Sequence, residues 1–256
     1  MRRMRTWCER FLRKRSSRAW FLTESNRIAC VKRMGLEAAG AMSRSPSAKR
    51  HTSSVSLKIL VDMDGVLCDF EAYLLEQFRS KFPDEPFIPV SERNTFYAHE
   101  QYGSIKVELK RNITDIMSSP GFFASLRPIS NAVTCMHWMR DIPDVSVWIC
   151  TSPINKYRNC VSEKYQWVEK HLGFEWTKRV IMCKDKTLIK GDYLIDDRPM
   201  IHGEEQFKPN FGKHVVFTQP YNCNVTTEWR LSLWPERKDK LLDFIMFLRE
   251  GLAFRD

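Results

Sequence analysis

The sequence lacks the features that define integral membrane proteins and proteins with cysteine-based zinc sites. It has no stretch of eighteen apolar residues, the length that a membrane-spanning helix needs. None of its eight cysteines belongs to a C-x-x-C pair or has a histidine at the spacing of a zinc site. With 43% hydrophobic and 28% charged residues, the chain has the composition of a globular protein. We predict that its cysteines are reduced thiols and that it does not associate with a membrane.

Acidic side chains are scarce at the start of the chain. Residues 1–56 hold 14 of the 41 Lys and Arg residues but only 3 of the 31 Asp and Glu residues. The formal charge of +10 therefore belongs to this segment, and residues 57–256 carry a net charge of −1. We predict that residues 1–56 form a disordered basic leader and that the folded body does not bind nucleic acid.

The leader admits two interpretations. Its Arg-rich segment Trp7–Trp20 is compatible with an amphipathic helix that directs a protein to the mitochondrial matrix. The alternative is an untargeted extension of a cytosolic protein, with Met34 or Met42 as the natural start.

Short apolar runs alternate with helical patterns from Leu57 onward, which predicts one α/β domain over residues 57–256 with helices on both faces of a parallel sheet. The interval 70–126 shows helical patterns without a strong strand, so we expect a small helical cap inserted after the first strand. The predicted strands are Leu57–Val61, Val145–Cys150, Arg179–Cys183, Tyr193–Ile195 and His214–Phe217. The predicted helices are Glu71–Phe82, Ile105–Met117, Asn131–Arg140, Tyr157–Leu172 and Trp234–Leu248, the last with Leu241, Leu242, Ile245 and Leu248 on one face.

Polar side chains follow the predicted strands at the edge of the sheet where α/β proteins bind ligands. They are Asp62 and Asp64, Thr151 and Ser152, Lys184 and Lys186, and Asp196 and Asp197. Each group alone is more often a solvated turn or surface charge, but all four together in this order favour a phosphate site.

Two carboxylates spaced i, i+2 can divide the work of phosphate hydrolysis. Asp62 is the candidate nucleophile, and Asp64 is the candidate acid and base. Because Asp62, Asp196 and Asp197 would repel a phosphate, the site needs a divalent cation. Mg²⁺ is favoured because it binds carboxylates, water and phosphate oxygens together.

The order of these motifs resembles the haloacid dehalogenase (HAD) superfamily of phosphatases and, within it, the 5′(3′)-deoxyribonucleotidases of the cytosolic and mitochondrial types. The resemblance covers the chain from about Leu57 to its end and implies a three-layer, Rossmann-like fold and a homodimer. The matching segments are Val61–Glu71, Ile149–Pro153, Glu163–Glu169, Asp185–Thr187 and Leu194–Arg198.

The resemblance implies that the chain hydrolyses deoxyribonucleoside monophosphates, chiefly dUMP and dTMP, through an aspartyl-phosphate on Asp62, with Asp64 as proton donor. Mg²⁺ would be bound by the carboxylates of Asp62 and Asp197 and by the backbone carbonyl of Asp64, supported by Asp196. The phosphate would be bound by four further residues, Thr151, Ser152, Lys164 and Lys186.

The resemblance also implies an aromatic subsite for the nucleoside. Phe70 and the stretch Phe96, Tyr97 and Ala98 match it, and an aromatic face suits a pyrimidine. Met117 stands where the family has a tryptophan or a tyrosine, which leaves the base preference open. Two alternatives remain: a HAD phosphatase for another small phosphomonoester, and a protein that binds nucleic acid through its basic leader.

Overall fold

The computed structural model of the chain describes residues 56–201, 203 and 208–253. The predicted leader, apart from its last residue, lies outside the described residues, as do Cys8 and Cys30. The six cysteines within the described part are all free thiols, as the sequence predicted.

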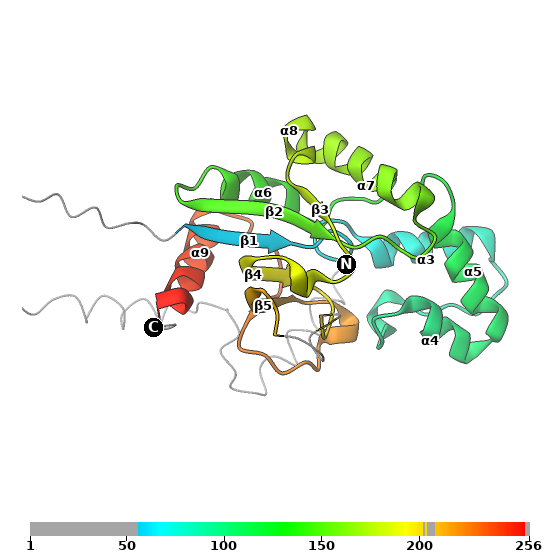
Figure 1. Cartoon of the computed structure of the whole chain (residues 1–256). Helices are drawn as coiled ribbons and strands as arrows, with labels where there is room; N and C mark the ends of the chain where they lie inside the picture. Colours follow the sequence, from blue (N-terminus) through cyan, green and yellow to red (C-terminus); the bar gives the residue numbers. More distant parts are fainter. Residues whose placement is uncertain (1–55, 202, 204–207, 254–256) are drawn as a thin grey trace, which may run out of the picture.

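The centre of the molecule is a six-stranded parallel sheet in the order β3-β2-β1-β4-β5-β6 (Figure 1). All five predicted strands are present, and the α/β class is confirmed. The two-residue β6 was not predicted because so short a strand leaves no apolar run in the sequence. The strands are β1 (Leu57–Val61), β2 (Val145–Thr151), β3 (Val180–Met182), β4 (Gly191–Asp196), β5 (Phe211–Phe217) and β6 (Arg230–Leu231).

Strand β1 lies between β2 and β4, so the segments that follow these three strands meet at one edge. Val61 pairs with Ile149 of β2 and with Ile195 of β4. Ile59 and Val61 belong to the larger core cluster, whereas Leu60 packs with the smaller one. Strand β1 is therefore buried on both faces, which explains why its sequence is continuously apolar.

The helices confirm the predicted pattern in part. Helices α3, α6 and α7 lie within one residue of their predicted bounds, and α4 and α8 were not predicted. The helical segments are α3 (Phe70–Lys81), η2 (Val90–Glu92), α4 (Ala98–Ile105), α5 (Val107–Ser118), α6 (Ala132–Arg140), α7 (Tyr157–Leu172), α8 (Phe174–Thr177), η3 (Lys186–Leu188), η4 (Pro220–Asn222) and α9 (Lys238–Ala253).

Two helix predictions were wrong in their limits. The predicted helix Ile105–Met117 is divided at Lys106, whose backbone is extended. The closing helix begins at Lys238 rather than Trp234, because Trp234 is buried in the core and its indole donates to the carbonyl of Val66 at 2.8 Å. Leu242 is 40% exposed, since its direction lies about 100° around the helix from that of Leu241.

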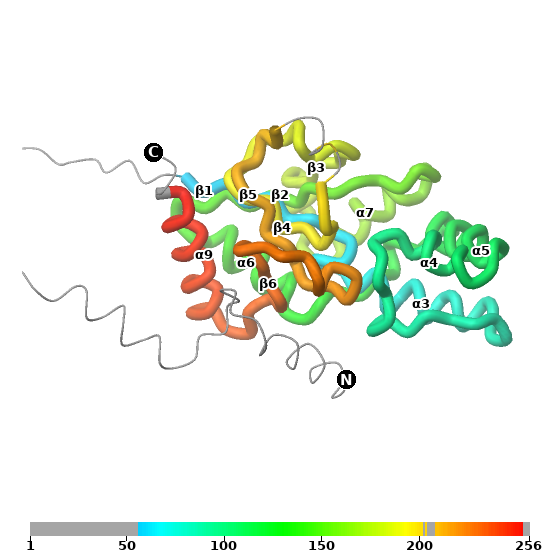
Figure 2. The backbone as a smooth tube through the Cα atoms, turned by 90° about the horizontal axis from the view of Figure 1, so that it is seen from below, coloured from blue at the N-terminus to red at the C-terminus, as the bar shows by residue number. Residues whose placement is uncertain are grey.

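Helices α3, α4 and α5 lie together at one end of the molecule, away from α9 (Figures 1 and 2). They are inserted between β1 and α6, on the side toward which β1 points. This position next to the end of β1 is where a cap over the strand ends would lie. Within the described residues, no helix is long and apolar enough to cross a membrane.

Candidate active site

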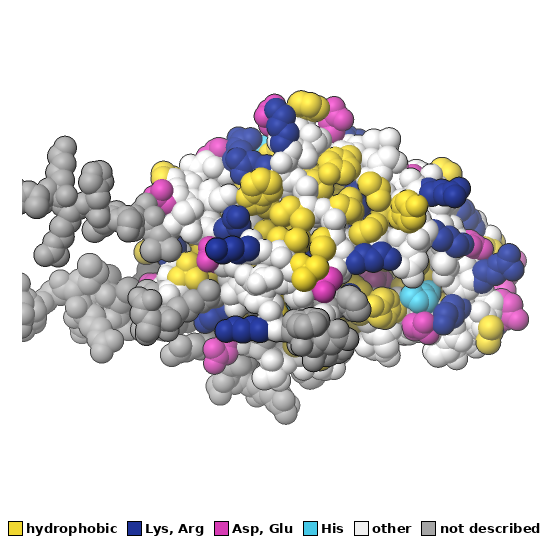
Figure 3. All heavy atoms as spheres, in the orientation of Figure 1, with side chains coloured by type: hydrophobic (Ala, Val, Ile, Leu, Met, Phe, Trp, Pro, Cys, Tyr) yellow, Lys and Arg dark blue, Asp and Glu magenta, His cyan; other side chains and the backbone are white. Residues whose placement is uncertain are grey.

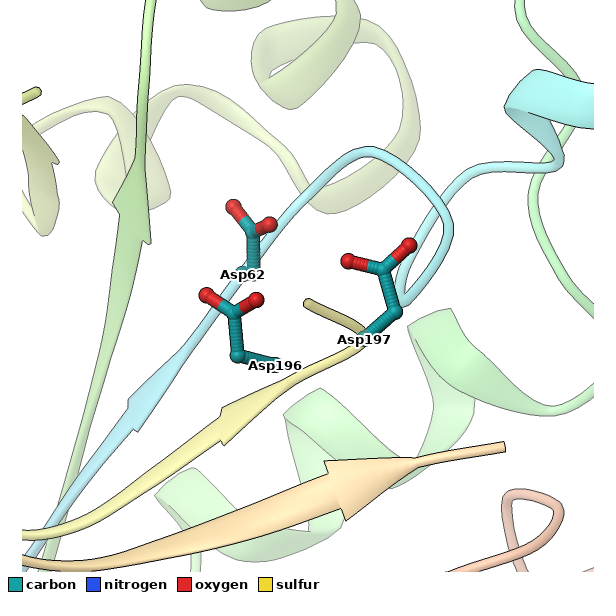
Figure 4. A group of neighbouring side chains, drawn as sticks. All are labelled: Asp62, Asp196 and Asp197. Atoms are coloured by element: carbon teal, nitrogen blue, oxygen red, sulfur yellow. The ribbon is translucent and has the colours of Figure 1, made fainter. Parts of the chain in front are cut away.

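Three buried carboxylates gather where β1 and β4 end. The backbone N–H of Asp62 donates to the carbonyl of Ile195 at 2.8 Å, which holds the two chain segments side by side. Asp62, Asp196 and Asp197 each offer a carboxylate oxygen, and these atoms lie within 4.8 Å of one another. Figure 4 shows the three side chains projecting from the ends of the two strands.

Lys186 of η3 lies between two of these acids. Its Nζ is 2.8 Å from Asp62 Oδ1 and 2.6 Å from Asp196 Oδ2. Burial raises the pKa of Asp62 to about 6 even though Lys186 opposes the change. Burial acts in the same direction on Asp196, but Lys186, His214 and the backbone N–H of Arg198 together outweigh it, so the pKa of Asp196 is lowered. The lowered pKa favours the ionised form of the Asp196 carboxyl.

The two carboxylate oxygens of Asp197 differ in their hydrogen bonding. Its Oδ2 accepts a short hydrogen bond from the hydroxyl of Tyr221, whereas its buried Oδ1 has no hydrogen-bond partner. Burial, reinforced by Asp196, raises the pKa of Asp197 well above its usual value. Next to it, Gly65 has φ +74°, and a Cβ there would collide with the Asp197 carboxylate. Glycine is therefore required at position 65 both for its backbone conformation and for its small size.

Lys164 of α7 connects the ends of β1 and β2. Its Nζ donates to Asp64 Oδ2 at 2.8 Å, to Thr151 Oγ1 at 2.7 Å and to the carbonyl of Ser152 at 2.9 Å. The Ser152 hydroxyl donates to the carbonyl of Cys183 at 2.7 Å. The Asp64 side chain is 24% exposed, so water can reach it, whereas Lys164 is fully buried.

The predicted lysines differ in position. Lys186 lies among the buried carboxylates, but Lys184 is exposed and donates to Asn155 at 2.8 Å. The structure therefore brings Asp62, Asp64, Thr151, Ser152, Lys164, Lys186, Asp196 and Asp197 together at the carboxyl ends of the strands, and it leaves Lys184 at the surface.

Phe70, the first residue of α3, belongs to an aromatic cluster beside Lys164. Its ring centroid lies 5.6 Å from that of Phe122 and 6.4 Å from that of Phe123. The Lys164 ammonium in turn lies 5.3 Å from the centroid of Phe123. Phe123 therefore connects the predicted nucleoside subsite to the predicted phosphate subsite.

Phe96 and Tyr97 form a second aromatic pair, with centroids 5.1 Å apart. The guanidinium of Arg198, which follows Asp197, lies 5.1 Å from the Phe96 centroid and 5.5 Å from that of Tyr97, and it donates to the Tyr97 hydroxyl at 2.6 Å. Ala98 belongs to the hydrophobic core, and half-buried Met117 packs against that core. Phe96 and Tyr97 thus contact the segment after β4.

Three residues of this region were not identified from the sequence. Phe123 could have been noticed in the aromatic pair Phe122-Phe123. Glu163 is buried on α7, where it accepts from the backbone N–H groups of Gly121 at 2.7 Å and Phe123 at 2.9 Å. Nothing in the sequence marked Tyr221 as a site residue. It lies after β5, and 24 residues separate it from Asp197 in the sequence.

The residues present fit a divalent cation. Within the part of the chain that the structure describes, the four carboxylates of Asp62, Asp64, Asp196 and Asp197 face two buried lysines. The unpartnered Asp197 Oδ1 is a hard oxygen donor of the kind that Mg²⁺ prefers. A bound cation would give this atom a partner and offset the excess negative charge.

Comparisons with known proteins agree with this fold. A structure of a HAD family hydrolase from Deinococcus radiodurans, with bound phosphate and sodium, superposes with a TM-score of 0.50 at 9% sequence identity, covering 76% of this chain and 97% of that one. The chain therefore has the α/β fold of the HAD hydrolases.

Sequence comparisons define the family. The model of the family described as 5′ nucleotidase, deoxy (pyrimidine), cytosolic type C matches residues 55–246. The human cytosolic 5′(3′)-deoxyribonucleotidase is 44% identical over 191 residues, which cover 73% of this chain and 94% of the relative. The mouse mitochondrial 5′(3′)-deoxyribonucleotidase is 40% identical over 198 residues, with coverages of 76% and 89%. The chain is a phosphoric monoester hydrolase, and it belongs to the 5′(3′)-deoxyribonucleotidase family.

Proposed function

We propose that the chain is a Mg²⁺-dependent 5′(3′)-deoxyribonucleotidase that prefers dUMP and dTMP and forms an aspartyl-phosphate on Asp62. One observation supports this most: three buried carboxylates and a buried lysine meet at the ends of β1 and β4, in a member of this family. Such an arrangement serves no packing purpose, since burying carboxylates costs free energy even when a lysine pairs with them.

The first chemical step breaks the ester bond of the substrate. A carboxylate oxygen of Asp62 attacks the phosphorus, a new O–P bond forms, and the bond from phosphorus to the sugar oxygen breaks. Asp64, protonated at this stage, gives its proton to the departing oxygen, so the deoxyribonucleoside leaves as a neutral alcohol.

The second step regenerates the enzyme. Asp64, now a carboxylate, takes a proton from a water molecule, whose oxygen attacks the phosphorus. The bond from phosphorus to Asp62 breaks, and inorganic phosphate leaves. The partial exposure of Asp64 suits this exchange with water, and buried Asp62 is held in place by Lys186.

The phosphate oxygens need positive partners throughout both steps. Lys186 and Lys164 supply two fixed charges, and Thr151 and Ser152 supply hydroxyl and backbone groups. The carboxylates of Asp62 and Asp197 and the backbone carbonyl of Asp64 would hold Mg²⁺, with Asp196 supporting them. The ion supplies charge that stabilises the phosphate in the transition state.

The nucleoside is proposed to lie between the aromatic groups of the cap, residues 70–126. Phe70 contacts Phe123 beside Lys164, and Phe96 and Tyr97 lie next to Arg198. Ala98 and Met117 complete this subsite in the proposal, and Met117 offers a flexible thioether rather than a ring.

A substrate panel with purified protein tests the function. With Mg²⁺, we expect kcat/KM for dUMP and dTMP to exceed that for sugar phosphates at least about tenfold, which corresponds to about 1.4 kcal/mol of transition-state binding. Turnover should stop in EDTA and return with added Mg²⁺, and Asp62→Asn serves as the inactive control. Equal rates for dUMP and sugar phosphates would favour the alternative of a HAD phosphatase for another phosphomonoester.

The protein's partners and location also belong to the proposal. Lys and Arg side chains on the face in Figure 3 are interspersed with acidic and hydrophobic ones, which does not favour nucleic-acid binding by the body. Hydrophobic side chains gather on the same face, which supports a homodimer.

We assign the chain to the mitochondrial matrix, with the cytosol as the alternative. The location of a fluorescent protein fused to residues 1–56 tests this assignment.

A further inference from the structure

Tyr221 lies between the acidic cluster and the aromatic pair Phe96-Tyr97. Its hydroxyl donates to Asp197 Oδ2, and its ring meets that of Phe96 edge to face, with centroids 5.8 Å apart and an interplanar angle of 87°. The guanidinium of Arg93 lies 6.0 Å from the Tyr221 centroid. Arg93 is held in turn by a buried ion pair with Glu71 of α3, at 2.7 Å.

The hydrogen bond from Tyr221 decides which oxygen of Asp197 is available. Oδ2 is occupied by the tyrosine hydroxyl and lies against Gly65, whereas Oδ1 is buried and without a partner. A carboxylate free to rotate would exchange these two oxygens. With Tyr221 and Gly65 on one side, only Oδ1 is available to a cation.

The turn that carries Tyr221 is attached to the same site at two further points. Asn222 Nδ2 donates to the backbone carbonyl of Asp197 at 2.6 Å and to that of Phe217 at 2.8 Å. Gln219 Nε2 donates to the carbonyl of Gly65 at 2.6 Å. The turn 219–222 therefore fixes the Asp197 backbone, the Asp197 side chain and the glycine beside them.

We propose that Tyr221 is a positioning residue that orients Asp197 for the metal ion and links this carboxylate, through Phe96, to the nucleoside subsite. The inference rests on the proposed function, since it requires Mg²⁺ at Asp197. Hydrogen-bond partners of metal ligands typically account for about 10–100-fold in metal affinity or activity.

Two substitutions separate the hydroxyl from the ring. Tyr221→Phe keeps the contacts with Phe96 and Arg93 but removes the donor, so the Mg²⁺ half-saturation should rise about 10–100-fold while KM for dUMP stays unchanged at saturating Mg²⁺. Tyr221→Leu also removes the ring, so it should raise both constants. Mg²⁺ binding is measured without substrate, by isothermal titration calorimetry and by the shift of the thermal melt, and then in the rate assay.

Tyr193→Phe is the matched control. Tyr193 is a buried tyrosine whose hydroxyl donates to the carbonyl of Leu248 at 2.7 Å, close to α9 rather than to the carboxylates. Its variant should lose stability with an unchanged Mg²⁺ half-saturation.

The outcomes of this experiment separate the two proposals. A Tyr221→Phe protein with wild-type Mg²⁺ affinity overturns the positioning role alone, and so does an equal loss of affinity in Tyr193→Phe. A wild-type protein that neither binds Mg²⁺ nor hydrolyses dUMP overturns the proposed function together with this inference.

Discussion

Replacing Asp62 by asparagine should abolish turnover in the presence of Mg²⁺ and should make the metal-free protein more stable. The Asp62 carboxylate is buried, and burial raises its pKa from 3.8 to about 6. The folded state therefore binds a proton more tightly at this position than the unfolded state does. The stability that Asp62 contributes is fully present below pH 3.8 and is lost as the pH rises through 6.

The size of the effect follows from the two pKa values. One pKa unit corresponds to about 1.4 kcal/mol, so the charged carboxylate lowers the free energy of unfolding by about 3 kcal/mol above pH 7. Asparagine does not ionise and avoids this loss. For a domain of this size, 1 kcal/mol shifts the melting temperature by about 2–4 °C, so Asp62→Asn should melt about 6–12 °C higher in EDTA at pH 7.5.

The assay is thermal unfolding in EDTA at several pH values, with Asp64→Asn as the matched control. Asp64 pairs with the fully buried ammonium of Lys164, so its removal should lower the melting temperature. The advantage of Asp62→Asn should shrink toward zero as the pH falls below 3.8, where Asp62 becomes protonated in both states. A variant that melts below the wild type at pH 7.5, or a gain that does not depend on pH, would refute the reasoning.

Two further predictions concern buried groups around the site. Lys186→Met should destabilise the protein by about 3–5 kcal/mol, because it leaves Asp62 and Asp196 buried without their cation. Urea unfolding should show a smaller loss of stability when Lys186→Met is made in the Asp62→Asn background. Equal losses of stability in the two backgrounds would contradict the pairing of Lys186 with Asp62. Glu163→Gln should lower the free energy of unfolding by about 1–3 kcal/mol and raise KM for dUMP, because the amide has one acceptor oxygen for the two backbone N–H groups, of Gly121 and Phe123, that Glu163 binds. Glu169→Gln, at an exposed position of the same helix, is the control. An unchanged KM for dUMP in Glu163→Gln would show that the turn 121–123 does not shape the nucleoside subsite.

The strand ends were predictable because their chemistry is local in sequence. An apolar run that stops at Asp62 and Asp64, or at Asp196 and Asp197, shows both the strand and the polar groups that follow it. Since parallel strands end at one edge, these residues could be placed together before their distances were known.

Long-range partners were not predictable in the same way. The helical pattern of α7 is visible in the sequence, but its periodicity could not show that Glu163 and Lys164 are buried among polar groups rather than exposed. Tyr221 follows an ordinary strand, and nothing near it in the sequence points to Asp197. The start of α9 was misplaced because Trp234 contributes to the core before the helix begins.

By itself, the sequence determined the α/β class, the order of the motifs and the types of residue at the site, because hydrophobic periodicity and strand-end chemistry act over a few neighbouring residues. Only the tertiary structure decided how these residues are paired: Lys186 with two acids, Lys164 with Asp64, and Tyr221 with one oxygen of Asp197. Such pairing depends on which side chains become neighbours when the sheet forms, and burial then sets the pKa values of the paired groups.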